Sequence, residues 1–114
     1  MAGLAYWPEK QAANVEPYFI VWCDEDGTNS GAAADDGALQ GATISTSTWT
    51  FPTGITKDSE NENAVTINGV VYAANTVATA WISGGTAGVT YTISCKITTS
   101  DSRTLDQTVY LPVV

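Results

Sequence analysis

The sequence predicts an all-β fold, and three observations lead to this class. Seventeen threonines, together with frequent Val, Ile, Tyr and Trp, give the composition typical of strands. Short breaks that carry Gly, Ser or Pro separate the strand-like stretches. No segment has apolar residues at the 3.6-residue spacing that an amphipathic helix requires. The 114 residues suit one domain with one modest core.

Residues 1–16 are predicted to form an extended N-terminal arm, ahead of a β domain over residues 17–114. Prolines interrupt the arm, and its start carries the apolar residues Leu4, Tyr6 and Trp7. An apolar arm that has no core of its own docks on a neighbouring subunit or on its own domain. We therefore predict Leu4, Tyr6 and Trp7 to be partner-binding residues.

The first half of the domain is predicted to contain two strands on either side of a long loop. Residues 18–23 are apolar on both faces, which is typical of a strand inside a sheet or covered by a partner. The chain over 24–41 is polar and rich in small residues, and we interpret it as one exposed loop. Strand chemistry returns over 43–51, around Trp49, and ends at a Pro-Thr-Gly turn. The acidic, Asn-rich stretch 57–63 is then expected to be a solvated loop.

The second half contains the clearest strand patterns. An Asn-Gly pair lies between β-formers in 65–71, which is the strongest short hairpin signal in the sequence, and residues 76–82 form a further strand. Apolar and polar residues alternate over 91–97 and again over 103–113, after a turn at 98–102. This alternation places one set of side chains on a core face: Tyr91, Ile93, Cys95, Ile97, Leu105, Val109, Leu111 and Val113.

Roughly seven short strands with polar turns in about 100 residues are typical of an immunoglobulin-like β-sandwich. Cys23, Trp49 and Cys95 also occur in the Cys…Trp…Cys order of that fold. A disulfide between the two cysteines would close a long loop and stabilise the fold by roughly 4 kcal/mol in the chain-entropy treatment. Disulfides are rare in a reducing cytosol. The alternative is that both cysteines are small buried hydrophobes, and the sequence leaves both readings open.

The charge balance argues against nucleic acid as a partner. The formal net charge is −8, and Lys10, Lys57, Lys96 and Arg103 are scattered, whereas phosphate binding needs clustered cations. The chain also has no histidine, which removes the usual acid–base group and the commonest metal ligand. Its carboxylates lie in polar runs that would not separate the pKa values of an acid–base pair. We therefore predict no enzyme activity and no cofactor.

The stretch Asp24-Glu25-Asp26-Gly27 resembles part of a calcium loop, because oxygen ligands surround a turn glycine. An EF-hand also needs a bidentate Glu at its twelfth position and flanking helices. Counted from Asp24, that position is Asp35, and no helix is predicted. We therefore predict no metal, with a structural Ca²⁺ held together with Asp35 and Asp36 as the alternative.

The N-terminal residues contain no basic start followed by an unbroken apolar stretch, so we do not predict a secretory signal. No window approaches the roughly 18 apolar residues of a membrane span. The protein is expected to be made and kept in a cytoplasm, unless it leaves as part of a larger assembly, and to have no membrane partner.

Three stretches resemble a family of small tailed-bacteriophage virion proteins, the fiber–tail adaptors. They are STWTFPTGIT at 47–56, ATAWISGGTAG at 78–88, and YTI at 91–93, which is followed by ITT at 97–99 and Arg-Thr at 103–104. Such proteins carry an STW-x-x-P-x-G-[IL] strand, a W-[IL]-SGGTAG turn, and then YT-[IV] and ITT-x-x-x-RT. The match covers roughly 18–113, and the family has no catalytic residues to carry over. The loop 24–41 and the hairpin over 65–74 are longer than expected for the family.

The resemblance implies a virion structural protein that joins fiber or baseplate components to the tail by non-covalent contacts. Its partners would be other virion proteins, with multiple copies in a symmetric assembly that forms in the host cytoplasm. Two alternatives stay open. One is a capsid decoration or cement protein on the phage head. The other is a glycan-binding host-recognition module that uses Trp7 and neighbouring aromatic residues.

Overall fold

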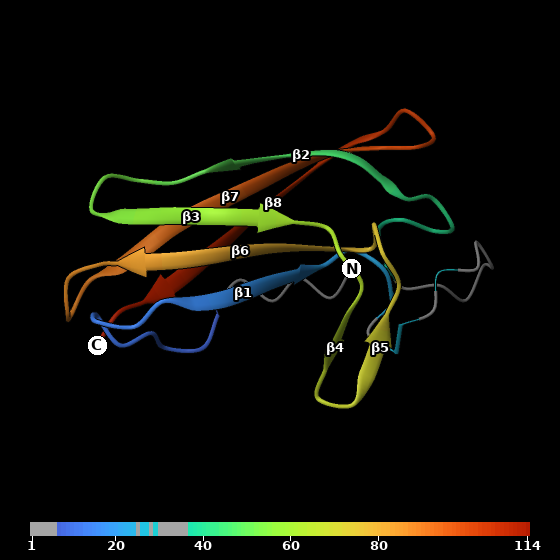
Figure 1. Ribbon diagram of the computed structural model, residues 1–114. Helices are drawn as coiled ribbons and strands as arrows, with labels where there is room; N and C mark the ends of the chain where they lie inside the picture. Colours follow the sequence, from blue (N-terminus) through green and yellow to red (C-terminus); the bar gives the residue numbers. More distant parts are fainter. Residues whose placement is uncertain (1–6, 25, 28, 30–36) are drawn as a thin grey trace.

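The computed structural model describes residues 7–24, 26, 27, 29 and 37–114 (Figure 1). As predicted, the regular structure in these residues is all β, with eight strands and no helix. None of the described residues therefore forms a helix that could cross a membrane. The strands are β1 (Glu16–Val21), β2 (Ile44–Thr50), β3 (Ile55–Asn61), β4 (Val65–Ile67), β5 (Val70–Tyr72), β6 (Val77–Gly84), β7 (Thr90–Thr99) and β8 (Thr104–Pro112).

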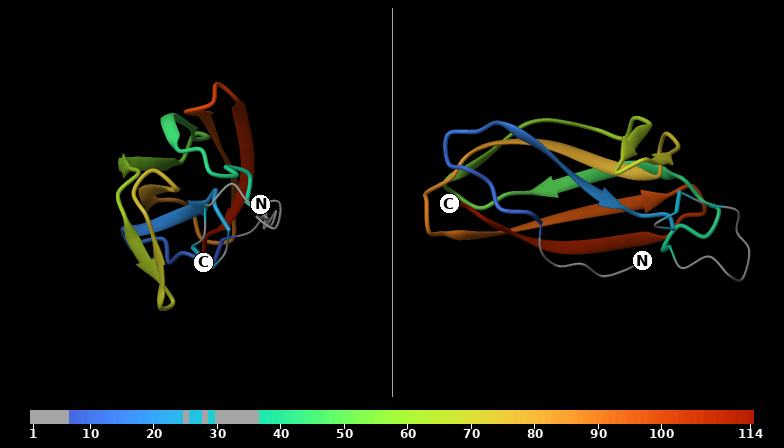
Figure 2. Two further views of the ribbon diagram at one scale, coloured as in Figure 1. Left: turned by 90° about the vertical axis from the view of Figure 1, so that its right-hand side faces the viewer. Right: turned by 90° about the horizontal axis from the view of Figure 1, so that it is seen from below.

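The six longer strands form two antiparallel three-stranded sheets, with the orders β1-β6-β3 and β2-β7-β8. Figure 2 shows the sheets as two facing layers, and buried side chains from both layers belong to one core cluster. This arrangement is a β-sandwich. The two orders correspond to the B-E-D and C-F-G orders of the immunoglobulin fold, which favours the immunoglobulin-like prediction.

Strands β7 and β8 follow the alternation that the sequence predicts. The inward residues of β7 are buried, and their polar neighbours lie on the outer face. On and beyond β8, Val109, Leu111 and Val113 are buried, while Leu105 is half-buried. Because a shift of one residue would turn every core side chain outward, this alternation determines the register of the β7–β8 pair.

Strand β3 lies where the sequence predicted a solvated loop, so that prediction is wrong. Of its seven residues only Ile55 is buried, which is why no apolar alternation is visible. The strand forms because it pairs with β6, with a bulge between Lys57 and Ser59. As an edge strand it needs hydrogen bonds on one side only, and charged residues and bulges protect such an edge from further pairing.

The hairpin predicted at Asn68-Gly69 is present as β4–β5, and it extends from one end of the sandwich (Figure 1). Both turn residues have positive φ, 50° and 81°, as a type I′ turn requires. Tyr72 is buried, whereas Val71 is 70% exposed. The backbone of Gly27 lies against the hairpin. A Cβ added to Gly27 would be 2.3 Å from the carbonyl oxygen of Val71, which is too close for a side chain.

Near its end, the loop 24–41 turns inward at Leu39, so this part is not exposed as predicted, whereas Gln40 and Gly41 are exposed. Leu39 is fully buried, and its N–H donates to the carbonyl of Trp22 at 3.1 Å. The Arg103 guanidinium donates to the carbonyls of Ala38 and Leu39, at 2.8 and 2.7 Å. A single apolar side chain in a polar run therefore occupies a core position, and an arginine from the β7–β8 turn holds it there.

Tyr91 connects the start of β7 to the preceding turn. Its hydroxyl accepts a hydrogen bond from the N–H of Thr86, at 2.9 Å. Its ring edge lies against Gly54, where an added Cβ would be 3.3 Å from the hydroxyl oxygen. Immunoglobulin-like sandwiches contain a similar tyrosine corner, in which a Tyr near the start of strand F bonds back to the backbone a few residues upstream.

Replacing Tyr91 with phenylalanine is expected to lower the free energy of unfolding by about 1 kcal/mol. The substitution keeps the buried ring but removes the only acceptor described for the Thr86 N–H. Urea denaturation followed by tryptophan fluorescence measures the change. Tyr91→Leu should be more destabilising, since it also removes ring packing. A Tyr91→Phe variant as stable as the wild type would contradict the proposed role of the hydroxyl.

Candidate partner-binding site

Trp7, one of the predicted partner-binding residues, lies in the core of its own sandwich. Its ring stacks on Tyr18 of β1 with 5.0 Å between centroids, and its centroid is 6.1 Å from that of Trp49 on β2. The indole N–H donates to the carbonyl of Phe19 at 2.9 Å, and the residue is 9% exposed. Trp7 therefore packs against side chains from both sheets.

The backbone that follows Trp7 runs along the edge of β8. The N–H groups of Trp7 and Lys10 donate to the carbonyls of Tyr110 and Pro112, both at 2.9 Å. Lys10 also forms a parallel bridge with the residue after β8. Residues 7–12, which we call the N-terminal segment, therefore extend the β2-β7-β8 sheet by a short parallel pairing.

Lys10 is fully buried, which is unusual for a lysine. Its Nζ donates to the carbonyl oxygens of Gln11, Ala12 and Gly84, at 2.9, 3.3 and 2.8 Å. An ammonium group has three N–H donors and no acceptor, so these three carbonyls satisfy it fully. Because Gly84 ends β6, Lys10 connects the N-terminal segment to the opposite sheet.

The predicted partner-binding residues are thus placed only in part, since Leu4 and Tyr6 lie outside the described residues. The ring of Trp7 is largely covered by this chain's own side chains. Docking on its own domain was one of the two outcomes expected for the arm. Binding of a partner through Leu4, Tyr6 and Trp7 stays a prediction.

A deletion test of that prediction should remove residues 1–6 alone. A deletion of residues 1–16 would also remove Trp7 from the core and Lys10 from its three carbonyls. Such a protein would lose stability, and its failure to enter particles would say nothing about docking.

The side chain of Asp24, in the acidic turn, forms a hydrogen bond with another residue of the same loop. One carboxylate oxygen of Asp24 accepts the N–H of Gly37 at 2.5 Å. Within the described residues, no group of three or more Cys, Asp or Glu could hold a metal ion. The calcium alternative also needed Asp35 and Asp36, which lie outside those residues.

Both cysteines are buried and free, in agreement with the reading of two small buried hydrophobes. Burial, with the nearby carboxylates of Glu60 and Glu62, raises the pKa of the Cys95 thiol to about 12. Burial also raises the pKa of Cys23. Since the thiolate is the reactive form, both side chains are expected to be inert in the folded protein.

We expect the protein to lose stability as the pH rises from about 9 towards about 12. In the unfolded chain the Cys95 thiol ionises near its ordinary value of 9.0, whereas in the fold its pKa is about 12. The Tyr18 hydroxyl contributes in the same direction, because burial and Glu16 raise its pKa from 10.0 to about 12 in the fold. The unfolded state therefore releases more protons in this range, and rising pH favours unfolding.

Denaturant titrations at several pH values over this range measure the effect as a falling midpoint. Cys95→Ala should reduce the slope without abolishing it, since Tyr18 still contributes. A midpoint that does not change between neutral pH and about pH 11 would contradict the two pKa shifts.

The outer face of the β1-β6-β3 sheet carries an exposed tryptophan. Trp81, on the central strand β6, is 39% exposed. In register it lies between Pro17 of β1 and Ser59 of β3. Its neighbours Ala80 and Ile82 are buried, so the alternation along β6 directs Trp81 outward.

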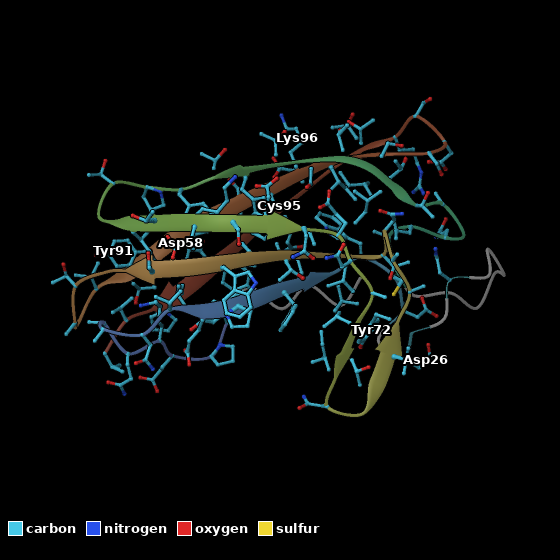
Figure 3. All side chains as sticks on the ribbon, in the orientation of Figure 1. Asp26, Asp58, Tyr72, Tyr91, Cys95 and Lys96 are labelled. Atoms are coloured by element: carbon cyan, nitrogen blue, oxygen red, sulfur yellow. The ribbon has the colours of Figure 1, made fainter. Side chains whose placement is uncertain are left out.

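The described positive charges are mostly engaged within the chain. Lys10 is buried under carbonyls, Lys57 pairs with Glu60, and Arg103 pairs with Asp101 at 2.9 Å. Lys96 points away from the sandwich (Figure 3). With a formal net charge of −8, the surface favours a partner with complementary positive charge. No sequence signal distinguished the buried Lys10 from a surface lysine.

Comparison with protein-family models matches residues 32–112 to the family described as podophage GP4 fiber-tail adaptor protein gp77. The matched range contains β2 to β8, whereas β1 and the N-terminal segment precede it. No curated protein and no solved structure matched the chain.

Proposed function

Because the chain belongs to the podophage GP4 fiber-tail adaptor protein gp77 family, we propose that it joins a fiber component to the tail by non-covalent contacts. Membership makes it a bacteriophage virion structural protein that binds other tail or fiber proteins. The family match, which spans seven of the eight strands, is the observation that carries the proposal.

The architecture supports a role in binding rather than in catalysis. The N-terminal segment bonds to both sheets through Trp7 and Lys10, which stiffens the sandwich as a spacer between two partners. The chain has no histidine, and its two thiols are buried with raised pKa values. The usual pairs of nucleophile and base cannot be built from these residues.

Cryo-electron microscopy of the intact particle tests the proposed location. Density for this sandwich at the junction between tail and fibers is the expected result, and particles that lack the protein should lose their fibers. Density on the capsomers would overturn the proposal in favour of the cement alternative. Absence of the protein from purified particles would overturn both.

A further inference from the structure

Three of the four outer edges of the sandwich are protected against further strand pairing. The edge of β1 contains Pro17, which has no N–H, and the carbonyl of Phe19 is already taken by the Trp7 indole. The edge of β8 is paired with the N-terminal segment at one end and carries the charged Asp106 towards the other. Proline, charge and covering segments are the usual devices that prevent edge pairing.

The edge of β3 is protected in a different way. Its central residues are Lys57, Asp58 and Glu60, and a bulge interrupts its register with β6. Charges and bulges on an outer strand make the addition of another strand unfavourable.

The strand β2 has a bulge between Ile44 and Thr46, but its edge has none of these features over residues 46–50. The sequence there is Thr-Ser-Thr-Trp-Thr, without charge or proline, and its pairing with β7 is regular over these residues. Among the described residues, no backbone hydrogen bond from outside the sheet reaches this stretch. Figure 1 shows β2 along the upper rim of the molecule. Every second residue of such a strand directs its N–H and C=O away from its sheet.

We propose that an extended segment of a partner virion protein pairs with β2 over residues 46–50 and adds a fourth strand to the β2-β7-β8 sheet. This inference rests on the proposed adaptor function, which requires a protein partner. Strand addition gives affinity through backbone hydrogen bonds and gives specificity through alternate side chains. The outward residues Thr46, Thr48 and Thr50 are exposed and β-branched, and such residues favour cross-strand pairs.

The charges beside this edge indicate the chemistry of the partner. Ser47 of β2 donates from its hydroxyl to a carboxylate oxygen of Glu62 at 3.0 Å. The two ion pairs of the described residues do not involve Glu62, so its charge is available to a cation. The partner segment should therefore carry a Lys or Arg opposite Ser47. A second copy of this chain is disfavoured because its own β2 is uncharged over residues 46–50 and offers no cation to Glu62.

Trp49 gives a second indication at the same strand. It is 8% exposed, and its indole N–H, like that of Trp22 after β1, is buried without an acceptor among the described residues. Leaving a buried donor unpaired is costly. A strand added beside β2 would bring new backbone and side-chain acceptors to this part of the sandwich.

Ser47→Lys is the variant that tests the proposal, with Ser59→Lys on the protected β3 edge as its matched control. Lysine at position 47 can pair with Glu62 in the free protein, but it would repel the cation of the partner. Like charges brought together at an interface oppose binding, so the amount of Ser47→Lys protein per particle should fall at least about tenfold. The Ser59→Lys protein should enter particles as the wild type does.

Thermal unfolding of the purified variants shows whether each is folded before the particles are examined. Wild-type incorporation of a folded Ser47→Lys protein would overturn the proposal, and so would equal loss for both variants. If the Ser47→Lys protein does not fold, the cryo-electron microscopy map of the wild-type particle tests the proposal instead. A strand from a different protein along β2 is the expected result, whereas solvent or a second copy there overturns the proposal.

The same map separates this inference from the proposed function. If the chain lies between tail and fiber with β2 uncovered, the inference fails and the adaptor function stands. If the chain lies on the head, the adaptor function fails, and the inference, which requires a fiber or tail partner, fails with it.

Discussion

Replacing Trp7 with alanine is expected to lower the free energy of unfolding by about 3 to 5 kcal/mol. The substitution removes a buried ring that packs against Tyr18 and Trp49, and it frees the carbonyl of Phe19. Since single domains are stable by only about 5 to 15 kcal/mol, this loss is a large part of the total. Guanidinium denaturation followed by far-ultraviolet circular dichroism measures it without depending on tryptophan fluorescence.

Two further variants separate the causes of this loss. Trp7→Phe keeps an aromatic ring and removes the hydrogen bond, so it should cost less than Trp7→Ala. Trp81→Ala removes a tryptophan that is 39% exposed, and it should cost less than about 1 kcal/mol. Equal effects of Trp7→Ala and Trp81→Ala would show that Trp7 does not hold the two sheets together.

Replacing Lys10 with methionine should cost about 2 to 4 kcal/mol of unfolding free energy. Methionine has a similar length and fills the space, but it leaves the carbonyls of Gln11, Ala12 and Gly84 without their shared donor. Removing a buried charge recovers part of its desolvation cost, which is why the expected loss is smaller than the sum of three charged hydrogen bonds.

The matched control is Lys96→Met, because Lys96 is exposed on the central strand β7. That change should alter stability by no more than about 0.5 kcal/mol. Urea denaturation of both variants and the wild type gives the comparison. A Lys10→Met protein as stable as the Lys96→Met protein would contradict the role assigned to the three carbonyls.

The sequence predicted those parts of the fold in which a strand has one solvent-exposed face and one buried face. In β7 this period is visible from Tyr91 to Ile97, because the inner side of the strand lies on the core. The β4–β5 turn was equally readable, since Asn68-Gly69 supplies two residues that tolerate positive φ. Both signals are local, so neighbouring residues alone carry them.

The parts that the sequence did not reveal depend on distant residues. β3 is a strand because β6 offers it hydrogen bonds, and its own residues are charged. Lys10 is buried because Gly84, far away in the sequence, supplies a carbonyl oxygen. The edge of β2 is open only in comparison with the other edges, which requires the sheet order to be known.

The pairing of the N-terminal segment with residues 110–114 has a consequence for synthesis of the protein. Trp7 and Lys10 leave the ribosome early, but the backbone groups that they bond to on and after β8 emerge about a hundred residues later. Until then the backbone N–H groups of Trp7 and Lys10 lack these acceptors, and the edge of β7 that pairs with β8 stays open. These contacts therefore form only after β8 has been made, and contacts this distant in sequence slow folding.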